Sequence, residues 1–212
     1  VIQDIDHSMR VNITAAVELA SEFLSRESGT FYYISSAHVY EPSDKPMTET
    51  ATTTPTSKYS EQKLLAELAL KDLFSLEPHR LCIVRVFSVL DWGCPPESLG
   101  GAIRALAFGK TGGMVVNSED VRDFLTPRTI ANSLVRIAEA GASGVLNLCS
   151  SKPLSIKEAA LSMFGSRDFD PTPLAFDRKN SARPALIGEN KRLLEILPDL
   201  GLVWTPSRFG PL

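Results

Sequence analysis

Leu81-Cys-Ile-Val-Arg-Val-Phe87 is a nearly continuous run of apolar residues in a chain of 212. Such runs are typical of strands that are buried on both faces of a parallel sheet. Phe31-Tyr-Tyr-Ile34 and Val145 to Cys149 show the same character. Segments with helical spacing separate the three runs. The sequence therefore predicts an α/β fold in which helices cover a parallel sheet.

Two helices are predicted around the first strand. Apolar residues recur at helical spacing from about Ser8 to Glu27, where Asp6 or Ser8 could cap the start. A second helix is predicted from about Ser57 to Phe74, and the Pro-, Thr- and Ser-rich stretch of residues 41–55 before it is predicted as a loop.

The second half of the chain has shorter and less regular elements. Its predicted elements are a helix over Leu99–Phe108, strands at Met114–Val116 and Val121–Phe124, a helix from Pro127 to about Ala140, a helix that starts at the capping-box spacing of Ser155 and Glu158, and a helix over about Asn190–Leu197. We therefore expect residues 1–93 to belong to the sheet domain. Residues 94–212 would form mostly a smaller mixed α/β lobe, with some elements returning to the sheet.

Composition excludes several classes of function. The net charge of −3 and pI of about 5.7 lack the basic footprint of a nucleic-acid binder. No apolar run approaches the roughly 20 residues of a membrane span. The three cysteines lie far apart, without the spacing of metal ligands, so we expect free thiols, no metal site and a reducing, cytoplasmic location.

Tyr59, Lys63 and Ser36 are the candidate catalytic residues. Tyr59 and Lys63 are four residues apart and so share a face of the predicted helix, while Ser36 follows the first strand. An ammonium about 5 Å from a phenol, at an effective dielectric of about 20, favours the phenolate by about 3 kcal/mol. We therefore expect Lys63 to lower the pKa of Tyr59 toward the range of a general acid/base, with Ser36 bound to the same substrate oxygen.

Several stretches, in order, resemble the extended short-chain dehydrogenase/reductases, in their NAD-dependent epimerase/dehydratase branch. They are Val11-Asn12, the Ser-Ser-x-x-Val-Tyr pattern in Phe31–Tyr40, the Pro-x-Ser-x-Tyr-x-x-x-Lys pattern in Pro55–Lys63, Val84-Arg-Val-Phe87, Val121-Arg-Asp-Phe-Leu125, Gly144-Val-Leu-Asn-Leu148 and Leu200-Gly-Leu-Val-Trp-Thr-Pro206. The resemblance implies a Rossmann-like doubly wound sheet, NAD or NADP as cofactor and a nucleotide-sugar as substrate. It also implies a homodimer formed through the helix bearing Tyr59 and the helix near Asn12.

The resemblance also implies a role for each matching residue. Tyr59 would be the catalytic acid/base, and Lys63 would hold the nicotinamide ribose and tune Tyr59. Ser36 would orient the reacting hydroxyl or carbonyl. Two more serines would also contact ligands: Ser35 would bind the cofactor and Ser88 the substrate. The substrate phosphates would bind Arg122, whose guanidinium suits phosphate oxygens, although an ion pair with Asp123 or another acid is the alternative.

The sequence departs from the family pattern at four places, which bear on its cofactor site and on the reaction it performs. The sequence has no Gly-x-x-Gly-x-x-Gly, so we expect a fragment whose first nucleotide-binding strands lie upstream. Ser88 replaces a common asparagine, and Leu90-Asp-Trp-Gly93 replaces Tyr-Gly-Pro. Ala37-His38 replaces the Asp-Glu pair of 4,6-dehydratases, which favours an epimerase or ketoreductase. His38 is either a further acid/base group or a loop residue. The alternative function is a non-catalytic relative that keeps the fold for binding or regulation.

Overall fold

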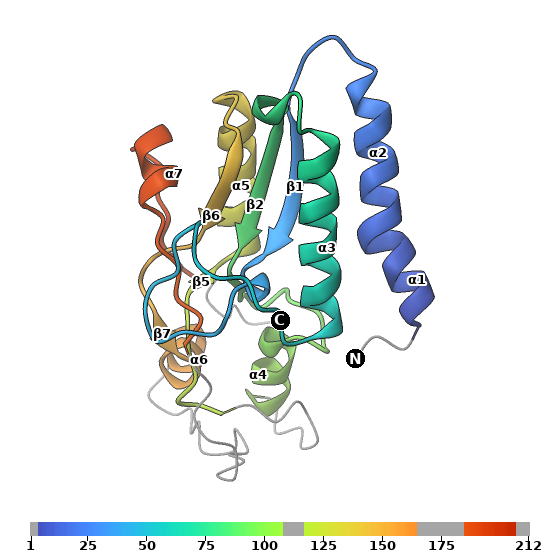
Figure 1. The fold of residues 1–212 in the computed structure, drawn as a ribbon. Coiled ribbons are helices and arrows are strands. Elements are labelled where there is room, and N and C mark those ends of the chain that lie inside the picture. Colours follow the sequence, from blue (N-terminus) through green and yellow to red (C-terminus); the bar gives the residue numbers. More distant parts are fainter. Residues whose placement is uncertain (1–3, 108–116, 165–184, 207–212) are drawn as a thin grey trace.

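The computed structural model describes residues 4–107, 117–164 and 185–206. Within these ranges, helices and strands alternate along the chain (Figure 1). The helices are α1 (Ile5–Met9), α2 (Ala15–Leu24), α3 (Lys58–Leu73), α4 (Leu99–Ala107), α5 (Pro127–Glu139), α6 (Ile156–Phe164) and α7 (Lys191–Ile196), with a π-helical turn at Arg10–Thr14 and 3-10 turns at Ala37–Val39 and Pro78–Arg80. The strands are β1 (Phe31–Ser36), β2 (Leu81–Val86), β3 (Ser88–Val89), β4 (Val121–Arg122), β5 (Phe124–Leu125), β6 (Gly144–Leu148) and β7 (Leu154–Ser155).

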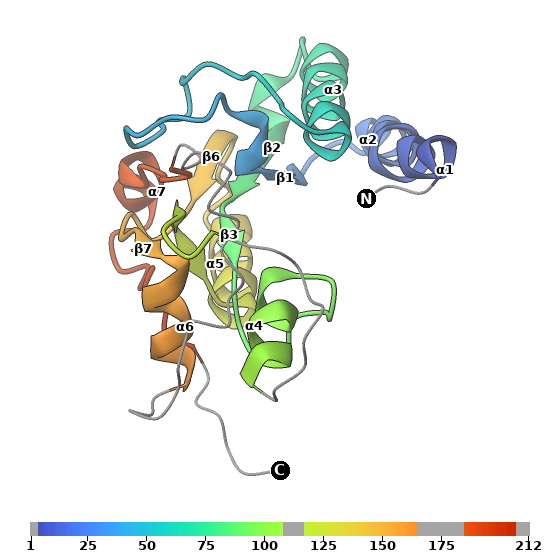
Figure 2. The ribbon, with the colours of Figure 1, turned by 90° about the horizontal axis from the view of Figure 1, so that it is seen from below.

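The three predicted apolar runs form one parallel sheet in the order β1-β2-β6. Helices cover both of its faces, as Figure 2 shows for α3 and α5. Ile83 of β2 packs in a core with α2 and α3, whereas its neighbours Cys82 and Val84 pack in a core with α5 and α7. Alternate residues of a strand point to opposite faces, so this strand is apolar on both sides. The predicted α/β fold with a parallel sheet is confirmed.

The shorter elements gather beyond the carboxyl ends of the sheet strands (Figure 1). There, β3 pairs with β5 in parallel and β4 pairs with β7 in antiparallel. A separate core, which includes Leu90, Ile103, Phe124 and Met163, joins these strands to α4 and α6. By contrast, β6 is a strand of the central sheet, and α5 and α7 pack against that sheet. The expected division of the chain near residue 93 stays a prediction.

Two local predictions need adjustment, and a third falls outside the described residues. The first helix begins at Ile5, because the Asp4 carboxylate caps it by accepting from the backbone N–H of His7, and it continues through a π-helical turn into α2. The strand expected at Val121–Phe124 is divided into β4 and β5 on either side of Asp123. The strand expected at residues 114–116 lies outside the described ranges.

No helix within the described ranges has both the length and the apolar character that crossing a bilayer requires. These same residues bring together no group of three or more His, Cys, Asp or Glu side chains that could hold a metal ion.

Candidate active site

Tyr59 lies in the first turn of α3, at a point that the local sequence fixes. Ser57 caps the helix: its hydroxyl accepts from the Ser60 N–H at 3.2 Å, and the Ser60 hydroxyl accepts from the Ser57 N–H at 3.0 Å. This reciprocal pair satisfies two backbone donors that a helix start leaves open. The cap therefore holds Tyr59 at the beginning of α3, and Lys63 follows one turn later.

Lys63 lies between two tyrosine rings at the end of β1. Its Nζ donates to the carbonyl oxygen of Ile34 at 2.9 Å. The same nitrogen is 4.9 Å from the ring centroid of Tyr33 and 5.9 Å from that of Tyr59. The carbonyl and the two rings together provide a negative environment that suits an ammonium. The sequence therefore placed Lys63 and Tyr59 correctly on one face of α3.

Ser36 completes the cluster from the strand side. Its side chain is buried, and its Oγ accepts from the backbone N–H of His38 at 3.2 Å. It is also close enough to the Tyr59 hydroxyl to lower the pKa of that phenol. Two hydroxyl groups and one ammonium thus meet where β1 ends and α3 begins. The structure brings together the three residues that the sequence selected as catalytic candidates.

The expected effect of Lys63 on Tyr59 is not observed. Burial raises the pKa of Tyr59 above its usual value, and the nearby Ser36 side chain lowers it by less. The reason is geometric, because Lys63 directs its ammonium to the Ile34 carbonyl rather than to the phenol oxygen. Burial also lowers the pKa of Lys63, which the nearby carboxylate of Glu67 opposes. In this arrangement Tyr59 carries its proton at neutral pH.

Ser35 points to a different partner from Ser36. Its hydroxyl donates to Oε1 of Glu67 on α3 at 2.6 Å, and both side chains are buried. The hydroxyl thus joins β1 to α3 beneath the cluster. Contact of Ser35 with a cofactor, as the resemblance implies, stays a prediction.

Arg122 lies in β4, in the region beyond the sheet. Its Nη2 is 3.9 Å from Oδ2 of Asp120, so Asp120 is one acid that lies near it. The Asp123 carboxylate instead accepts from the backbone N–H groups of Ser150 and Ser151 at 2.7 and 2.8 Å. Burial lowers the pKa of His38, and the charge of Arg122 lowers it further. Arg122 is therefore close enough to influence the loop that follows Ser36.

Ser88 is the first residue of β3, and its N–H donates to the Asp123 carbonyl oxygen at 2.9 Å. Its side chain is partly exposed. Ser88 therefore follows β2 at the same end of the sheet as Ser36, and its role at the substrate stays a prediction.

Sequence reasoning missed a buried ion pair below the cluster. Arg85 on β2 donates to Glu67 through Nε at 3.0 Å and Nη2 at 2.6 Å. The Arg85 guanidinium also lies 4.6 Å from the ring centroid of Tyr40. The sequence did contain an indication of this pair, because an arginine inside an apolar strand requires a buried partner for its charge. The identity of that partner depended on the packing of α3 against the sheet.

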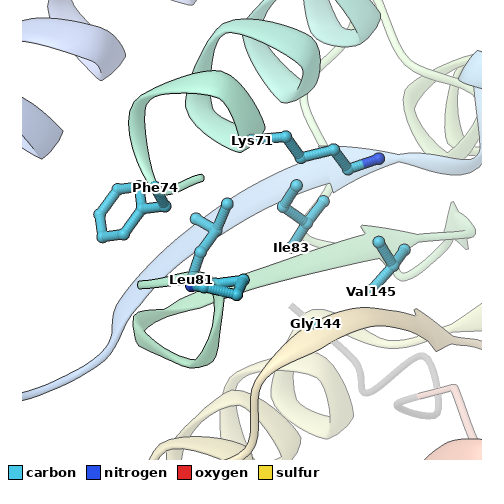
Figure 3. A pocket seen from close by; sticks show the side chains of 7 residues that line it. Lys71, Phe74, Leu81, Ile83, Gly144 and Val145 are labelled. Carbon is cyan, nitrogen blue, oxygen red and sulfur yellow. The ribbon is translucent and has the colours of Figure 1, made fainter. Parts of the chain in front are cut away.

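A pocket of about 170 Å³, lined by described residues, lies away from the cluster of Tyr59, Lys63 and Ser36 (Figure 3). Its lining includes Leu81 and Gly144, the first residues of β2 and β6, the side chain of Lys71 on α3, and the side chain of Phe74, which follows α3. It is thus at the opposite end of the strands from Ser36.

The comparison with protein families gives a match over residues 2–149, to the NAD dependent epimerase/dehydratase family. The chain belongs to this family. The match includes the candidate cluster, both hydroxyl groups and the ammonium, as well as the whole central sheet. A comparison with curated protein sequences finds no match.

Solved structures of similar fold support the assignment. A UDP-N-acetylglucosamine 4-epimerase from Methanobrevibacter ruminantium, in complex with UDP-N-acetylmuramic acid, has 21% identity and a TM-score of 0.73, over 92% of this chain and 67% of that one. RMD from Pseudomonas aeruginosa, complexed with NADPH, has 23% identity and a TM-score of 0.73, over 94% of this chain and 73% of that one.

A dTDP-glucose 4,6-dehydratase from Bacillus anthracis, in complex with NAD, has 15% identity and a TM-score of 0.72. The match covers 90% of this chain and 62% of that one, so this epimerase/dehydratase family member spans less than two thirds of that enzyme's length. At these identities the likeness shows the fold, which is the Rossmann-like parallel sheet predicted from the sequence.

Proposed function

We propose that this chain carries the proton-transfer site of an NAD- or NADP-dependent epimerase or ketoreductase that acts on a nucleotide-activated sugar. The observation that carries the proposal is the meeting of Tyr59, Ser36 and Lys63 at the carboxyl end of β1. This edge of a parallel sheet is where ligands of such folds collect. Three solved structures of the same fold, by their descriptions, hold NAD, NADPH or a UDP-sugar.

The residues present fit the reactive end of a dinucleotide. Lys63 offers an ammonium to ribose hydroxyls, and Tyr59 lies beside it, while Ser35 precedes Ser36 in the strand that borders them. The sequence holds no Gly-x-x-Gly-x-x-Gly for the pyrophosphate, so another segment must supply that contact. When bound, the nicotinamide accepts or returns the hydride of the sugar carbon.

The proton step belongs to this chain's own residues. For carbonyl reduction, protonated Tyr59 donates its proton to the oxygen that becomes a hydroxyl, and Ser36 donates a hydrogen bond to the same oxygen. For the reverse step, the alcohol proton passes to the Tyr59 phenolate. The ammonium of Lys63 stabilises that phenolate when it moves from Ile34 toward the phenol oxygen. Arg122 supplies a cation for the phosphates of the substrate.

Calorimetric titration of the full-length protein with NAD and NADP, followed by turnover assays with UDP-, dTDP- and GDP-sugars, tests this function. We expect one dinucleotide to bind and at least one nucleotide-sugar to be epimerised, reduced or oxidised. Failure of both dinucleotides to bind would support the alternative, a non-catalytic relative. The altered segment from Ser88 to Gly93 and the missing glycine motif are the observations that favour this alternative.

The proposal includes a homodimer. Leu19 of α2 is 65% exposed, and Leu65 and Leu68 of α3 are 51% and 53% exposed. These two helices lie side by side, at the edge of the molecule (Figure 1). A second copy packed on this face would remove the leucines from water. Sedimentation should show a dimer that Leu68→Glu dissociates, whereas Leu76→Glu, at a 95% exposed position beyond α3, should leave it intact.

Finally, we propose a cytoplasmic location. Cys82, Cys94 and Cys149 are all buried free thiols, which suits a reducing compartment. Fractionation of the source cells with an antibody to the protein tests this location.

A further inference from the structure

The buried ion pair of Glu67 and Arg85 lies directly behind the candidate catalytic residues. The side chain of Glu67 is 0% exposed and that of Arg85 is 3% exposed. Removing two charges from water costs free energy that their attraction only partly returns. A pair of apolar residues at the same positions would therefore often make the protein equally stable. A buried pair at this point therefore needs another explanation.

Position along the chain connects the pair to the site. Glu67 follows Lys63 by one turn of α3, so the two side chains are on the same face of the helix. Ser35, which donates to Glu67 at 2.6 Å, immediately precedes Ser36 in β1 and is aligned with Arg85 in β2. The Glu67 carboxylate thus fixes α3 to two strands at the level of the cluster.

Charge connects them as well. Lys63 is faced by Tyr59 and Glu67 from its own helix and by Tyr33 and the Ile34 carbonyl from β1. Of these, Glu67 opposes the effect of burial and raises the pKa of Lys63. The Glu67 carboxylate is in turn shared with Lys71, whose Nζ is 3.8 Å away and whose side chain is 43% exposed.

We propose that Glu67, held by Arg85 and Ser35, is a positioning residue that fixes α3 against β1 and β2 and thereby holds Lys63, one turn earlier on the same helix face, beside Tyr59. The inference rests on the proposed function, because the role of Lys63 in catalysis belongs to that proposal. Glu67 itself touches neither substrate nor cofactor. It acts through Lys63 and through the strand that carries Ser36.

The test is an NMR titration of the Lys63 side chain in protein labelled at lysine, with Lys63→Arg used to assign the signal. We expect Glu67→Gln to lower the pKa of Lys63 by about half a unit or more, because the opposing carboxylate is removed. The matched control is Glu77→Gln. Glu77 forms an equally short bridge of 2.6 Å to a buried arginine, Arg80, just before β2 and far from Lys63.

Two results would overturn the proposal: an unchanged titration of Lys63 in Glu67→Gln, or an equal shift in Glu77→Gln. If Glu67→Gln leaves Arg85 unpaired and fails to fold, Glu67→Gln with Arg85→Gln removes both buried charges, and the pKa of Lys63 should still fall, but by less, because the cation that offset Glu67 is removed as well. Turnover of the full-length Tyr59→Phe variant tests the catalytic proposal separately. If that variant is fully active while Glu67→Gln shifts the titration, the proposed function fails and the electrostatic role of Glu67 stands.

Discussion

Lys63 donates its ammonium proton to the carbonyl oxygen of Ile34, 2.9 Å away. Ile34 is in β1, which lies at one edge of the described sheet, opposite β6. This bond holds the lysine at the sheet edge, beside the Tyr59 ring and away from a direct contact with its oxygen. Proton transfer through a Tyr59 phenolate therefore requires Lys63 to change its partner. The resting arrangement favours the protonated phenol, which is the form that a reductase needs.

Tyr59→Phe should lower turnover of the full-length protein by about 100-fold or more, because general acid/base groups contribute about that much. Folding should change little, since the ring is kept and its exposure is already 42%. Steady-state kinetics and circular dichroism check both statements. Tyr32→Phe is the control, because its hydroxyl donates to the Ala138 carbonyl at 3.4 Å, on the α5 side. Full turnover in Tyr59→Phe would contradict the role given to the phenol.

Arg122→Gln should weaken nucleotide-sugar binding by about tenfold or more, because a charged hydrogen bond to phosphate contributes about 1.5–3 kcal/mol. Dinucleotide binding should not change. Calorimetry with each ligand separates the two effects. Arg128→Gln, at an exposed position in the first turn of α5, is the matched control. If Arg122→Gln weakened both ligands equally, the guanidinium would be serving the structure, through Asp120, rather than the substrate.

The main fold was predictable because its signals are local. Continuous apolar runs gave the three sheet strands, and the four-residue spacing of Tyr59 and Lys63 put both on one face of α3. The predicted capping box of Ser155 and Glu158 is also confirmed, since the Glu158 carboxylate accepts from the Ser155 N–H at 2.7 Å and the Ser155 hydroxyl accepts from the Glu158 N–H.

The details that depend on distant contacts were not predictable. The spacing of Tyr59 and Lys63 could not show that the ammonium prefers Ile34, because that choice depends on how α3 packs on β1. In the same way, the Asn147 N–H donates to the carboxylate of Glu49, 98 residues earlier in the chain, at 3.0 Å. Residues this far apart in the chain are not connected by the helical or strand periodicity from which the prediction was made. The site could be located from the sequence, but its electrostatics could not.

Tyr40 predicts a loss of stability at high pH. Burial raises its pKa to about 12 from the model-compound value of 10.0, and its hydroxyl donates to Oδ1 of Asn147 at 2.6 Å. The unfolded chain ionises this phenol at a lower pH than the folded chain does. Tyr40 therefore contributes fully to the free energy of unfolding below the pKa of the unfolded chain. This contribution is lost as the pH rises through the pKa of the folded chain.

By about pH 11 this loss should be about 1.4 kcal/mol. Denaturant unfolding at pH 8 and pH 11 measures it, and Tyr40→Phe should make the fall smaller by about that amount. Burial also raises the pKa of Tyr33, so a remaining fall in the variant is expected. An identical pH dependence in wild type and Tyr40→Phe would show that Tyr40 ionises equally in both states.

Asp123→Asn should destabilise the junction between the sheet and the smaller elements. The Asp123 side chain is fully buried, and Oδ1 accepts from both the N–H and the hydroxyl of Ser150 at 2.7 Å, while Oδ2 accepts from the Ser151 N–H at 2.8 Å. An amide has one oxygen, so its NH₂ group must face a donor on one side. We expect the free energy of unfolding to fall by about 2–3 kcal/mol, because a buried donor is left unsatisfied.

The same substitution at an exposed capping position provides a comparison. Glu158→Gln also converts a carboxylate that accepts from a serine N–H and hydroxyl into an amide, but at the surface of α6. There, water can replace a lost partner, so the free energy of unfolding should fall much less than in Asp123→Asn. Denaturant unfolding of the two variants at neutral pH measures the difference. Equal effects would mean that the buried hydrogen bonds of Asp123 contribute no more than a surface cap, and that β4 and β5 are held together by their apolar contacts alone.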